Sequence, residues 1–503
     1  MPRRSPFRLT LALVTVIFLL STSPAFGAIS RAFIMQRAET WVNKRIPYSQ
    51  TGWANLAGDI VTSPSLGWRR DCSGFASMCW GLSTPGAYTW TWRNYGEAID
   101  KAVLQPGDAL VSPRNHAVLF GGWADAAHAT YYCYEMSYSA SKNSTPTPDG
   151  TRVKVTPYPY WGGDYTYAPY RKPGVTGSID YSPFITPVEG PNRYATAVAA
   201  SRAAFPAGGA ATVIVASGEN WPDALGASAL AGAVRGPILL TPRGALPGEV
   251  AGEIARLGAK EAIIVGGSAA VGHGVQQALD ALSGVSVLRL GGRDRFETSS
   301  LIVGETQRRM YAAGRALEGP VFVATGGNFP DALAASPIAY SHVQPLLLTS
   351  SAALSSQAES SLASLEATSA IVLGGTASVS GAVETRLAEL LGAANVRRIA
   401  GSDRYQTGYL VALYGHDERG LKYTGAAVAT GANFPDALGG GAMAGELGTV
   451  LLLTSPGRLE GSVADLMLAN AAEFEKPHCL GGHATLKSIV REAIALMLED
   501  SNH

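Results

Sequence analysis

The string Asn220-Trp221-Pro222-Asp223-Ala224-Leu225 decides the fold of most of this chain, because it occurs three times. The other two copies are Asn328-Phe329-Pro330-Asp331-Ala332-Leu333 and Asn433-Phe434-Pro435-Asp436-Ala437-Leu438. The three aspartates are separated by 108 and then 105 residues. A repeat of that length is a whole domain rather than one turn of a solenoid. The sequence therefore predicts three small domains in series.

Apolar runs flank each copy of the string. They lie at 213–216, 321–324 and 427–429 before the copies, and at 238–241, 346–349 and 451–454 after them. Continuous apolar runs are typical of strands buried on both faces, so we expect three α/β modules, each with a parallel sheet covered by helices. The proline in each string suits the first turn of a helix, and the aspartate after it is favoured there by the helix dipole. We therefore interpret these aspartates as structural.

The whole chain can be divided into six segments. We expect a signal peptide (1–27), a mixed α+β domain (28–175), a linker (176–190) and three repeats (191–291, 292–400 and 401–503). In the first domain, helices are expected near 40–44 and over 73–82, and strands over 116–123 and 129–136. The linker is expected because the chain from 172 to 191 is rich in Pro, Gly and Ser.

The first 27 residues have the composition of a secretory signal. Arg3, Arg4 and Arg8 precede an apolar run at 9–20, and small residues follow. That run is short for a membrane span, although an uncleaved anchor is the alternative. We expect no membrane span after removal of the signal. The sequence predicts a secreted protein that is either soluble or cell wall associated.

Charge and cysteine usage exclude several classes of protein. The formal net charge is zero, but residues 28–175 carry 14 Lys and Arg against 10 Asp and Glu, and residues 176–503 carry 22 against 29. The sequence has no basic block interleaved with aromatic residues, which is the pattern that indicates nucleic acid binding. The sequence has no cluster of His, Cys and Asp at the spacing of metal ligands, so neither a metal nor a cofactor is expected. Four cysteines are too few for a disulfide framework, although a Cys79–Cys133 pair is left open.

The string Asp71-Cys72-Ser73-Gly74-Phe75 offers a nucleophile at the start of a predicted helix. A helix N-terminus and a nearby imidazolium both stabilise a thiolate. His116, 44 residues later, heads an apolar strand and is the expected proton acceptor. A third polar group orients such an imidazole. We expect Glu135 from the adjacent strand in this role, with His128 in the connecting loop as the alternative.

This pattern resembles the NlpC-type papain-like cysteine peptidases, which cut cell wall peptides. The resemblance covers about residues 30–170 and includes 47–49, 71–75, 106–110 and 116–123. It implies a papain-like domain with Cys72 as nucleophile and His116 as base. It also implies that Tyr48, Asp71 and Ser73 bind the free amino end of the peptide. The chain departs from the family at the third position, where a second histidine is usual.

The repeats resemble the cell wall binding repeat 2 family of Gram-positive bacteria over about residues 188–500. The resemblance implies three modules around a pseudo-threefold axis and non-covalent attachment to an anionic cell wall polymer. Because the region is net negative, binding would need local basic spots such as Arg193, Arg295 and Arg404. The alternative is that these arginines are structural partners of the repeat carboxylates.

Together these features predict a hydrolase that cleaves amide bonds in peptidoglycan stem peptides through a Cys–His acyl-enzyme. The alternatives are an N-acetylmuramoyl-alanine amidase or acyltransferase on the same scaffold, and a wall-anchored surface protein without activity. The sequence leaves open the bond cut, the polymer bound and the oligomeric state. The expected partners are peptidoglycan peptides and an anionic wall polymer.

Overall fold

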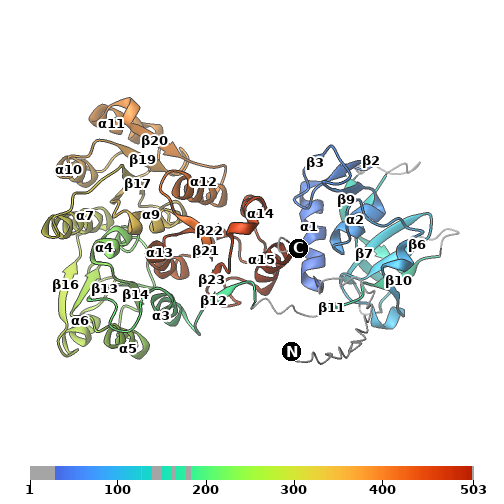
Figure 1. Ribbon diagram of the computed structural model, residues 1–503, viewed down its shortest axis with the longest axis horizontal. Coiled ribbons are helices and arrows are strands. Elements are labelled where there is room, and N and C mark those ends of the chain that lie inside the picture. Colours follow the sequence, from blue (N-terminus) through green and yellow to red (C-terminus); the bar gives the residue numbers. More distant parts are fainter. Residues whose placement is uncertain (1–28, 126, 139–149, 161–165, 177–182, 501–503) are drawn as a thin grey trace, which may run out of the picture.

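The computed structural model describes residues 29–125, 127–138, 150–160, 166–176 and 183–500. The predicted signal peptide lies outside these residues. Two parts are visible in Figure 1, an N-terminal domain in blue and a larger repeat region coloured from green to red. No helix among the described residues is long and apolar enough to cross a membrane.

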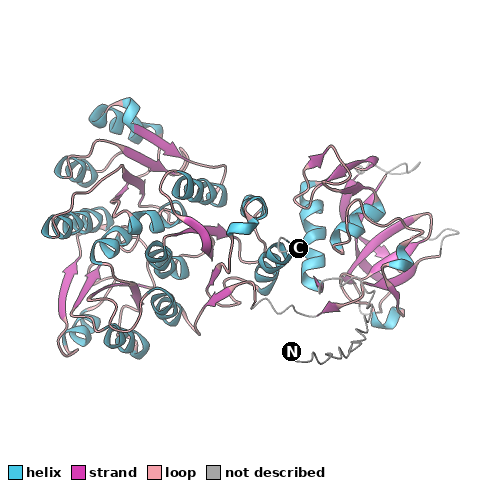
Figure 2. Cartoon of the chain, viewed as in Figure 1, coloured by secondary structure: helices cyan, strands magenta, loops and turns pink. Residues whose placement is uncertain are grey.

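The N-terminal domain is built on a six-stranded sheet with the order β5-β10-β6-β7-β8-β9, in which every neighbouring pair is antiparallel. A smaller sheet, β3-β2-β4, lies beside it (Figure 2). The strands are β1 (Ile29–Ser30), β2 (Ser49–Ala54), β3 (Ile60–Val61), β4 (Trp68–Arg70), β5 (Glu97–Ala98), β6 (Ala109–Ser112), β7 (His116–Trp123), β8 (Thr130–Ser137), β9 (Gly150–Pro157), β10 (Ala168–Arg171) and β11 (Val175–Thr176).

The described part of this domain also contains two α-helices, α1 (Arg31–Lys44) and α2 (Cys72–Cys79), and two short 3-10 helices (Trp92–Asn94 and Lys101–Val103). Each α-helix begins at a capping side chain, because the hydroxyl of Ser30 and the carboxylate of Asp71 accept hydrogen bonds from free N–H groups of the first turn. Every residue of α2 is buried, which explains its small and apolar composition. The helix predicted over 73–82 is therefore confirmed, but it begins one residue earlier, at Cys72, and ends at Cys79.

The repeat region consists of three modules, each with a four-stranded parallel sheet. The first sheet contains β14 (Ile238–Thr241), β13 (Thr212–Ser217), β15 (Glu261–Val265) and β16 (Ser286–Leu290). The second contains β18 (Leu346–Thr349), β17 (Val321–Thr325), β19 (Ala370–Leu373) and β20 (Val396–Ile399). The third contains β22 (Thr449–Thr454), β21 (Lys422–Thr430), β23 (His478–Leu480) and β12 (Thr186–Val188).

Helices cover these sheets. They are α3 (Arg193–Ala204), α4 (Ala227–Val234), α5 (Gly248–Leu257) and α6 (His273–Asp280) in the first module, α7 (Arg295–Ala312), α8 (Pro330–Ala334), α9 (Ser336–Ser341), α10 (Ser356–Ser364) and α11 (Gly381–Leu391) in the second, and α12 (Arg404–Asp417), α13 (Pro435–Leu447), α14 (Gly461–Ala469) and α15 (Ser488–Asp500) in the third. The expected α/β modules with parallel sheets are confirmed.

The three modules surround a common centre. Helices α4, α9 and α13 contact one another pairwise there, which gives the arrangement an approximate threefold character (Figure 1). Gly232 of α4 makes the close approach possible, because a Cβ at this position would collide with the backbone of Tyr340. The proline begins the helix in the second and third modules, at Pro330 and Pro435. In the first module the equivalent residues form a turn, and α4 begins only at Ala227.

The segment predicted as a linker, residues 176–190, contains a strand. Within it, β12 pairs in parallel with β23, so it forms the edge of the third sheet. In the first two modules β16 and β20 hold that edge, and each leads into the helix of the following module. In the third module the strand that precedes α3 takes this place and closes the ring. The linker prediction was wrong here because β12 is short and contains Pro187, which reads as a loop.

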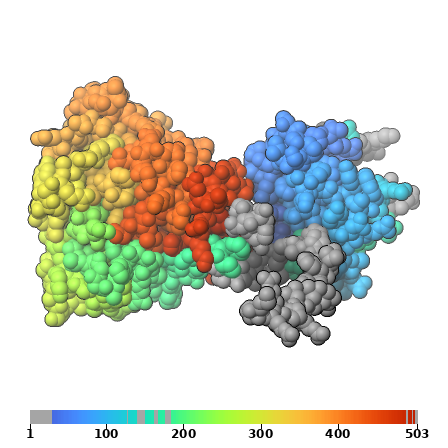
Figure 3. All heavy atoms as spheres, viewed as in Figure 1, coloured from blue at the N-terminus to red at the C-terminus, as the bar shows by residue number. Residues whose placement is uncertain are grey.

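The two parts of the molecule are also in contact. Helix α1 packs against α15, and the space-filling view shows the N-terminal domain meeting the third module (Figure 3). The hydroxyl of Ser30 donates a hydrogen bond to the buried carboxylate of Glu492. The N-terminal domain, for which the sequence predicts the catalytic role, is therefore packed directly against the third module.

Candidate functional site

Cys72 is the first residue of α2, and its side chain is 9% exposed. Asp71 caps this helix and accepts from the N–H of Gly74 at 2.6 Å. The N–H groups of the first helical turn have no partner within the helix, so they create a positive potential beside the thiol. Local sequence places the cysteine here, because Asp71 stops the preceding strand and caps the helix.

His116 is the first residue of β7, and Glu135 lies on the adjacent strand β8. Helix α2 packs on both strands. The Nε2 atom of His116 lies 3.2 Å from Oε2 of Glu135, and the Cys72 thiol is a second hydrogen-bonding partner of the imidazole. The structure thus brings together the three residues that the sequence singled out for catalysis.

Glu135 is fully buried and receives several donors. Arg152 Nε lies 2.7 Å and Lys154 Nζ 2.8 Å from Oε1, and the hydroxyl of Tyr160 donates to Oε2. The carboxylate is therefore held rigidly in place. Arg152, Lys154 and Tyr160 were missed from the sequence, although the two basic residues alternate along β9 and so point to one face of the sheet.

These contacts shift the pKa values of the pair. Burial would lower the pKa of His116, but its hydrogen bonds and charge interactions with Cys72 and Glu135 raise it to about 9. Burial would raise the pKa of Glu135, but His116 and Lys154 hold it well below its usual range. At neutral pH the site therefore contains an imidazolium beside a carboxylate.

His128, the alternative third residue, lies in the turn between β7 and β8. Its exposed ring stacks on Trp123 with centroids 4.6 Å apart. Trp123 ends the strand that His116 begins, so the two histidines lie at opposite ends of β7. The structure places Glu135, and not His128, against His116.

The three residues expected to bind substrate have different surroundings. Burial, together with the charges of Cys72 and Asp71, raises the pKa of Tyr48, and Gln50 Nε2 donates to its hydroxyl at 3.2 Å. Ser73 donates to Asp71 Oδ1 at 3.0 Å, and Arg69 Nε lies 2.9 Å from Oδ2 of the same carboxylate. Asp71 and Ser73 thus make internal contacts that shape the start of the helix, whereas Tyr48 is half-buried.

An exposed aromatic pair lies next to these residues and was missed from the sequence. The rings of Tyr88 and Trp90 stack with centroids 4.5 Å apart, and they are 42% and 53% exposed. The guanidinium of Arg69 lies 3.9 Å from the ring centroid of Tyr88. The hydroxyl of Thr89 accepts from the N–H of Arg114, two residues before His116. This loop therefore contacts both Arg69, which precedes Cys72, and Arg114, which precedes His116.

The repeat region has a second constellation, which crosses from module to module. Asp223 interacts with Arg295 and Thr298 of the second module. Asp331 interacts with Arg404 of the third, and Asp436 with Arg193 of the first. Each arginine belongs to the module that follows in the ring. Each also donates a hydrogen bond to a glycine carbonyl of its own module, at Gly218, Gly326 or Gly431.

An aromatic cluster lies beside these pairs. Phe329 is 6.0 Å from Trp221 and 5.9 Å from Phe434 between ring centroids. The guanidinium groups of Arg295 and Arg404 lie over Trp221 and Phe329. Arg295 and Arg404 thus contact a carbonyl and a ring, and all three arginines interact electrostatically with a repeat carboxylate, which favours the structural role that the sequence left open.

Two other expectations can be compared with the described residues. In the described part of the chain, no group of three or more His, Cys, Asp or Glu side chains is arranged to hold a metal ion. All four cysteines are buried and free, so Cys79 and Cys133 are not paired. Burial raises the pKa of both Cys79 and Cys133, which suits unreactive, packed thiols.

Comparison with known proteins identifies the repeats. The family described as Cell wall binding domain 2 (CWB2) matches residues 188–276, 289–384 and 398–490. Together the three matches cover more than half of the chain. Each begins within or at the end of an edge strand, β12, β16 or β20, and continues into the arginine-led helix.

Two proteins of Bacillus subtilis (strain 168) are similar in sequence. The chain is 28% identical over 268 residues to N-acetylmuramoyl-L-alanine amidase LytC, which is 53% of this chain and 50% of that protein. It is 30% identical over 217 residues to an amidase enhancer, which is 43% of this chain and 28% of that protein. Each match is longer than the part of the chain before residue 188, so each extends into the repeats.

Two solved structures from Clostridium difficile share the fold. Cwp8 superposes with a TM-score of 0.55 at 28% identity, covering 63% of this chain and 52% of that one. Cwp6 superposes with a TM-score of 0.55 at 20% identity, covering 78% and 63%.

Proposed function

Because the chain belongs to the cell wall binding domain 2 family, and is thereby associated with the cell wall, we propose that its N-terminal domain is a papain-like cysteine hydrolase. Its substrates would be amide bonds in peptidoglycan stem peptides, and the three modules would hold it on the wall. One observation carries this proposal. A thiol at a helix N-terminus shares an imidazole with a buried carboxylate, and that combination is the arrangement that cysteine hydrolases need.

The reaction begins with the Cys72 thiolate. Its sulfur attacks the carbonyl carbon of the amide, and the carbonyl oxygen becomes an oxyanion. The N–H groups at the start of α2, including that of Cys72, donate to this oxyanion. Nε2 of His116 faces Glu135, which leaves Nδ1 for the thiol and the leaving group.

The second half regenerates the enzyme. The C–N bond breaks as His116 gives its proton to the departing amine, and a thioester joins the acyl group to Cys72. His116 then takes a proton from water, whose oxygen attacks the thioester. The C–S bond then breaks, the acid product leaves, and the Cys72 thiolate and the His116 imidazolium are restored.

Several neighbours support this chemistry. Glu135 stabilises the imidazolium and fixes the ring, and Arg152, Lys154 and Tyr160 fix Glu135 in turn. Tyr48 would offer its hydroxyl to the substrate, as the resemblance implies. Asp71 and Ser73 shape the amino-end subsite that the resemblance implies. The aromatic pair of Tyr88 and Trp90 extends the surface beside it.

The anchoring role rests on the repeats. Family membership supports binding of an anionic wall polymer, and three linked modules would raise the effective concentration. Arg193, Arg295 and Arg404 would act mainly by joining neighbouring modules, because their guanidinium groups already donate to carbonyls and are attracted by the carboxylate of another module. Any contact that they make with polymer would be additional.

The proposal is tested by two measurements on the full chain. Iodoacetamide at neutral pH should modify Cys72 much faster than the three other cysteines. Soluble muropeptides should be cleaved by the wild type and not by Cys72→Ala. A Cys72 that reacts no faster than Cys79, together with intact muropeptides, would indicate a surface protein without activity.

An amidase is the second candidate, and the similarity to LytC favours it. An amidase would cut between the glycan and the first residue of the stem peptide. Mass analysis of the products separates the two candidates, because an amidase releases the whole peptide whereas a peptidase shortens it. Transfer of the acyl group to an added amine would instead indicate an acyltransferase.

A further inference from the structure

Arg69 is a buried arginine beside the helix start that carries the proposed nucleophile. It is 5% exposed. Its Nε atom donates to Asp71 Oδ2 at 2.9 Å, and its Nη2 atom donates to the hydroxyl of Ser73 at 3.2 Å. The remaining N–H groups donate to the carbonyls of residues 85–87. All five donors of this guanidinium therefore have partners within the protein, which fixes its position.

Asp71 has no uncompensated charge to offer a substrate. Arg69 neutralises its carboxylate, and Oδ1 of the same carboxylate accepts from the N–H of Gly74 at 2.6 Å and from the hydroxyl of Ser73 at 3.0 Å. Only 13% of the side chain is exposed. A free amino end carries a positive charge, and such a charge needs a negative partner when it leaves water. In this chain the negative charge of Asp71 already has its partner.

A second guanidinium lies near Tyr48, on the other side of the same subsite. Arg70 Nη1 donates to the carbonyl of Pro47, the residue before Tyr48, at 3.3 Å. Arg70 forms no ion pair with any described residue. An ammonium group beside Tyr48 and Asp71 would therefore meet two positive charges and one negative charge. A neutral amide in the same place avoids this repulsion.

The stacked rings of Tyr88 and Trp90 adjoin this subsite. The guanidinium carbon of Arg69 lies 3.9 Å from the ring centroid of Tyr88, and the same guanidinium donates to Ser73. Both rings are exposed, and the angle between their planes is 12°. Exposed apolar patches of this kind mark binding surfaces, and a flat aromatic surface suits the C–H face of a sugar ring.

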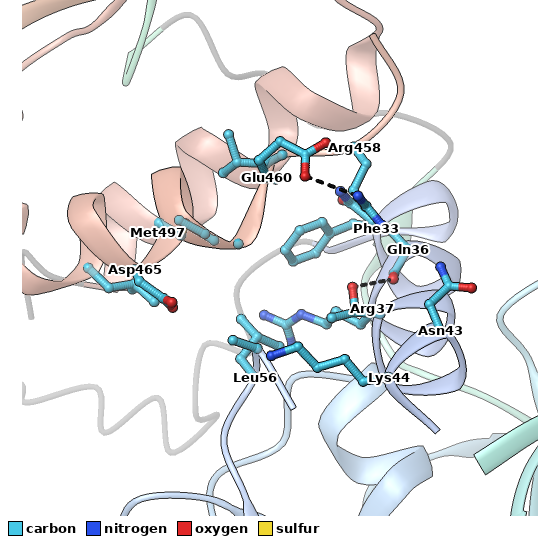
Figure 4. Close-up of a pocket in the computed structure, with 17 residues that line it drawn as sticks. Phe33, Gln36, Arg37, Asn43, Lys44, Leu56, Arg458, Glu460, Asp465 and Met497 are labelled. Atoms are coloured by element: carbon cyan, nitrogen blue, oxygen red, sulfur yellow. Dashed lines mark hydrogen bonds and ion pairs between the residues drawn. The ribbon is translucent and has the colours of Figure 1, made fainter. Parts of the chain in front are cut away.

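The third module leaves this aromatic surface accessible. Helix α1 and the loop after β2 face that module, and together with α14 and α15 they line a cavity of about 380 Å³ (Figure 4). Neither Tyr88 nor Trp90 lines this cavity, and both stay exposed in the full chain. A long glycan strand can therefore reach the two rings.

We propose that the site takes stem peptides whose amino end is still acylated by the muramic acid of the glycan, in preference to peptides with a free amino end. The sugar packs on Tyr88 and Trp90, and the amide lies beside Tyr48 and Asp71. This inference rests on the proposed function and specifies its substrate. It reverses the expectation, implied by the resemblance, that this subsite holds a free amino end.

The test uses one stem tetrapeptide in three forms, with a free amino end, N-acetylated and N-acetylmuramoylated. Each is titrated calorimetrically at neutral pH into the full chain carrying Cys72→Ala, so that binding is measured without turnover. We expect the muramoyl peptide to bind at least about 10-fold more tightly than the free peptide, with the acetyl peptide between them. Equal binding of all three, preferred binding of the free peptide, or binding of none would overturn the proposal.

Further variants, made in the Cys72→Ala chain, assign the preference to particular residues. Trp90→Ala should make the muramoyl and acetyl peptides bind equally, whereas Tyr132→Ala, which removes an exposed ring on β8, should keep the difference. Arg69→Gln should reduce the preference for the acetyl over the free peptide several-fold. If that variant does not fold, Arg70→Gln removes the other positive charge. A muramoyl advantage that survives Trp90→Ala would contradict the proposed surface.

Hydrolysis by the wild type separates this inference from the proposed function. If the wild type cleaves none of the peptides while Cys72→Ala prefers the muramoyl peptide, the hydrolase assignment fails and the substrate preference is confirmed. If the wild type cleaves the free peptide as efficiently as the muramoyl peptide, the hydrolase assignment is supported and this inference is overturned.

Discussion

Glu135 in the N-terminal domain and the three repeat aspartates are all buried or half-buried carboxylates near arginine, yet their pKa values shift in opposite directions. Burial raises the pKa of Asp223, Asp331 and Asp436, because each has only weak compensation. Burial acts in the same direction on Glu135, but His116 and Lys154 outweigh it and lower its pKa. The repeats use carboxylates to join modules. The N-terminal domain concentrates donors on one carboxylate that faces a histidine.

The opposite pKa shifts distinguish the repeat aspartates, which have a structural role, from Glu135, for which we propose a role in catalysis. A joining contact that occurs three times can lose one copy at a modest energetic cost. The Cys72–His116–Glu135 cluster occurs once, and its three groups act on one another. We therefore expect substitutions in the cluster to change activity more than stability, and substitutions at the joining pairs to do the reverse.

The largest effect is expected at Cys72. Replacement by alanine should abolish muropeptide hydrolysis, because no other described nucleophile lies beside His116. Binding to purified walls should be unchanged, since all three repeats are intact. Hydrolysis is followed by mass analysis and binding by sedimentation with walls. More than a trace of residual hydrolysis would exclude Cys72 as the nucleophile.

Glu135→Gln should have the next largest effect. The amide keeps the shape but loses the charge that stabilises the imidazolium, so we expect hydrolysis to fall by about 10- to 10³-fold. His128→Ala is the matched control, because His128 lies at the far end of β7. If His128→Ala abolishes hydrolysis and Glu135→Gln has no effect, the assignment of the orienting residue is wrong.

The pH dependence of stability should reveal the charge on His116. Its pKa in the folded protein is about 9, above the ordinary value of 6.5. The stabilisation is therefore complete below pH 6.5 and is lost as the pH rises through about 9. Relative to His116→Gln, the wild type should lose up to about 3 kcal/mol of unfolding free energy across this window. A difference that is independent of pH, measured by urea unfolding, would show that His116 is not charged in the folded state.

The smallest effect is expected at a joining pair. Asp331→Ala and Arg404→Ala should each destabilise the ring, and a double-mutant cycle should give a coupling energy of about 1 kcal/mol. Muropeptide hydrolysis should be unchanged in each single variant. Denaturant unfolding of the four proteins gives the cycle. Full additivity would mean that the two residues do not interact across the module boundary.

Much of the fold was predictable because the chain repeats itself. Three copies of one string, each between apolar runs, gave the modules and their parallel sheets without reference to any contact. The closure of the ring was not predictable. Strand β12 contains Thr186, Pro187 and Val188, and only its pairing with β23 identifies it as a strand.

The candidate site was also predictable only in part. Cys72 and His116 could be found from local sequence, because a cap, a helix start and a strand start are local signals. The partners of Glu135 could not, since Arg152, Lys154 and Tyr160 reach it across strand pairs and turns. The cross-module contacts of Arg404 are likewise set by how modules pack, and sequence alone left two roles open for it.

The most direct test of the account is mass analysis of purified peptidoglycan after incubation with the full chain and with Cys72→Ala. The account predicts that the wild type releases fragments in which one amide bond has gained one molecule of water, and that the variant binds the walls but releases none. Identical fragments from both proteins, or intact peptidoglycan with the wild type, would contradict it.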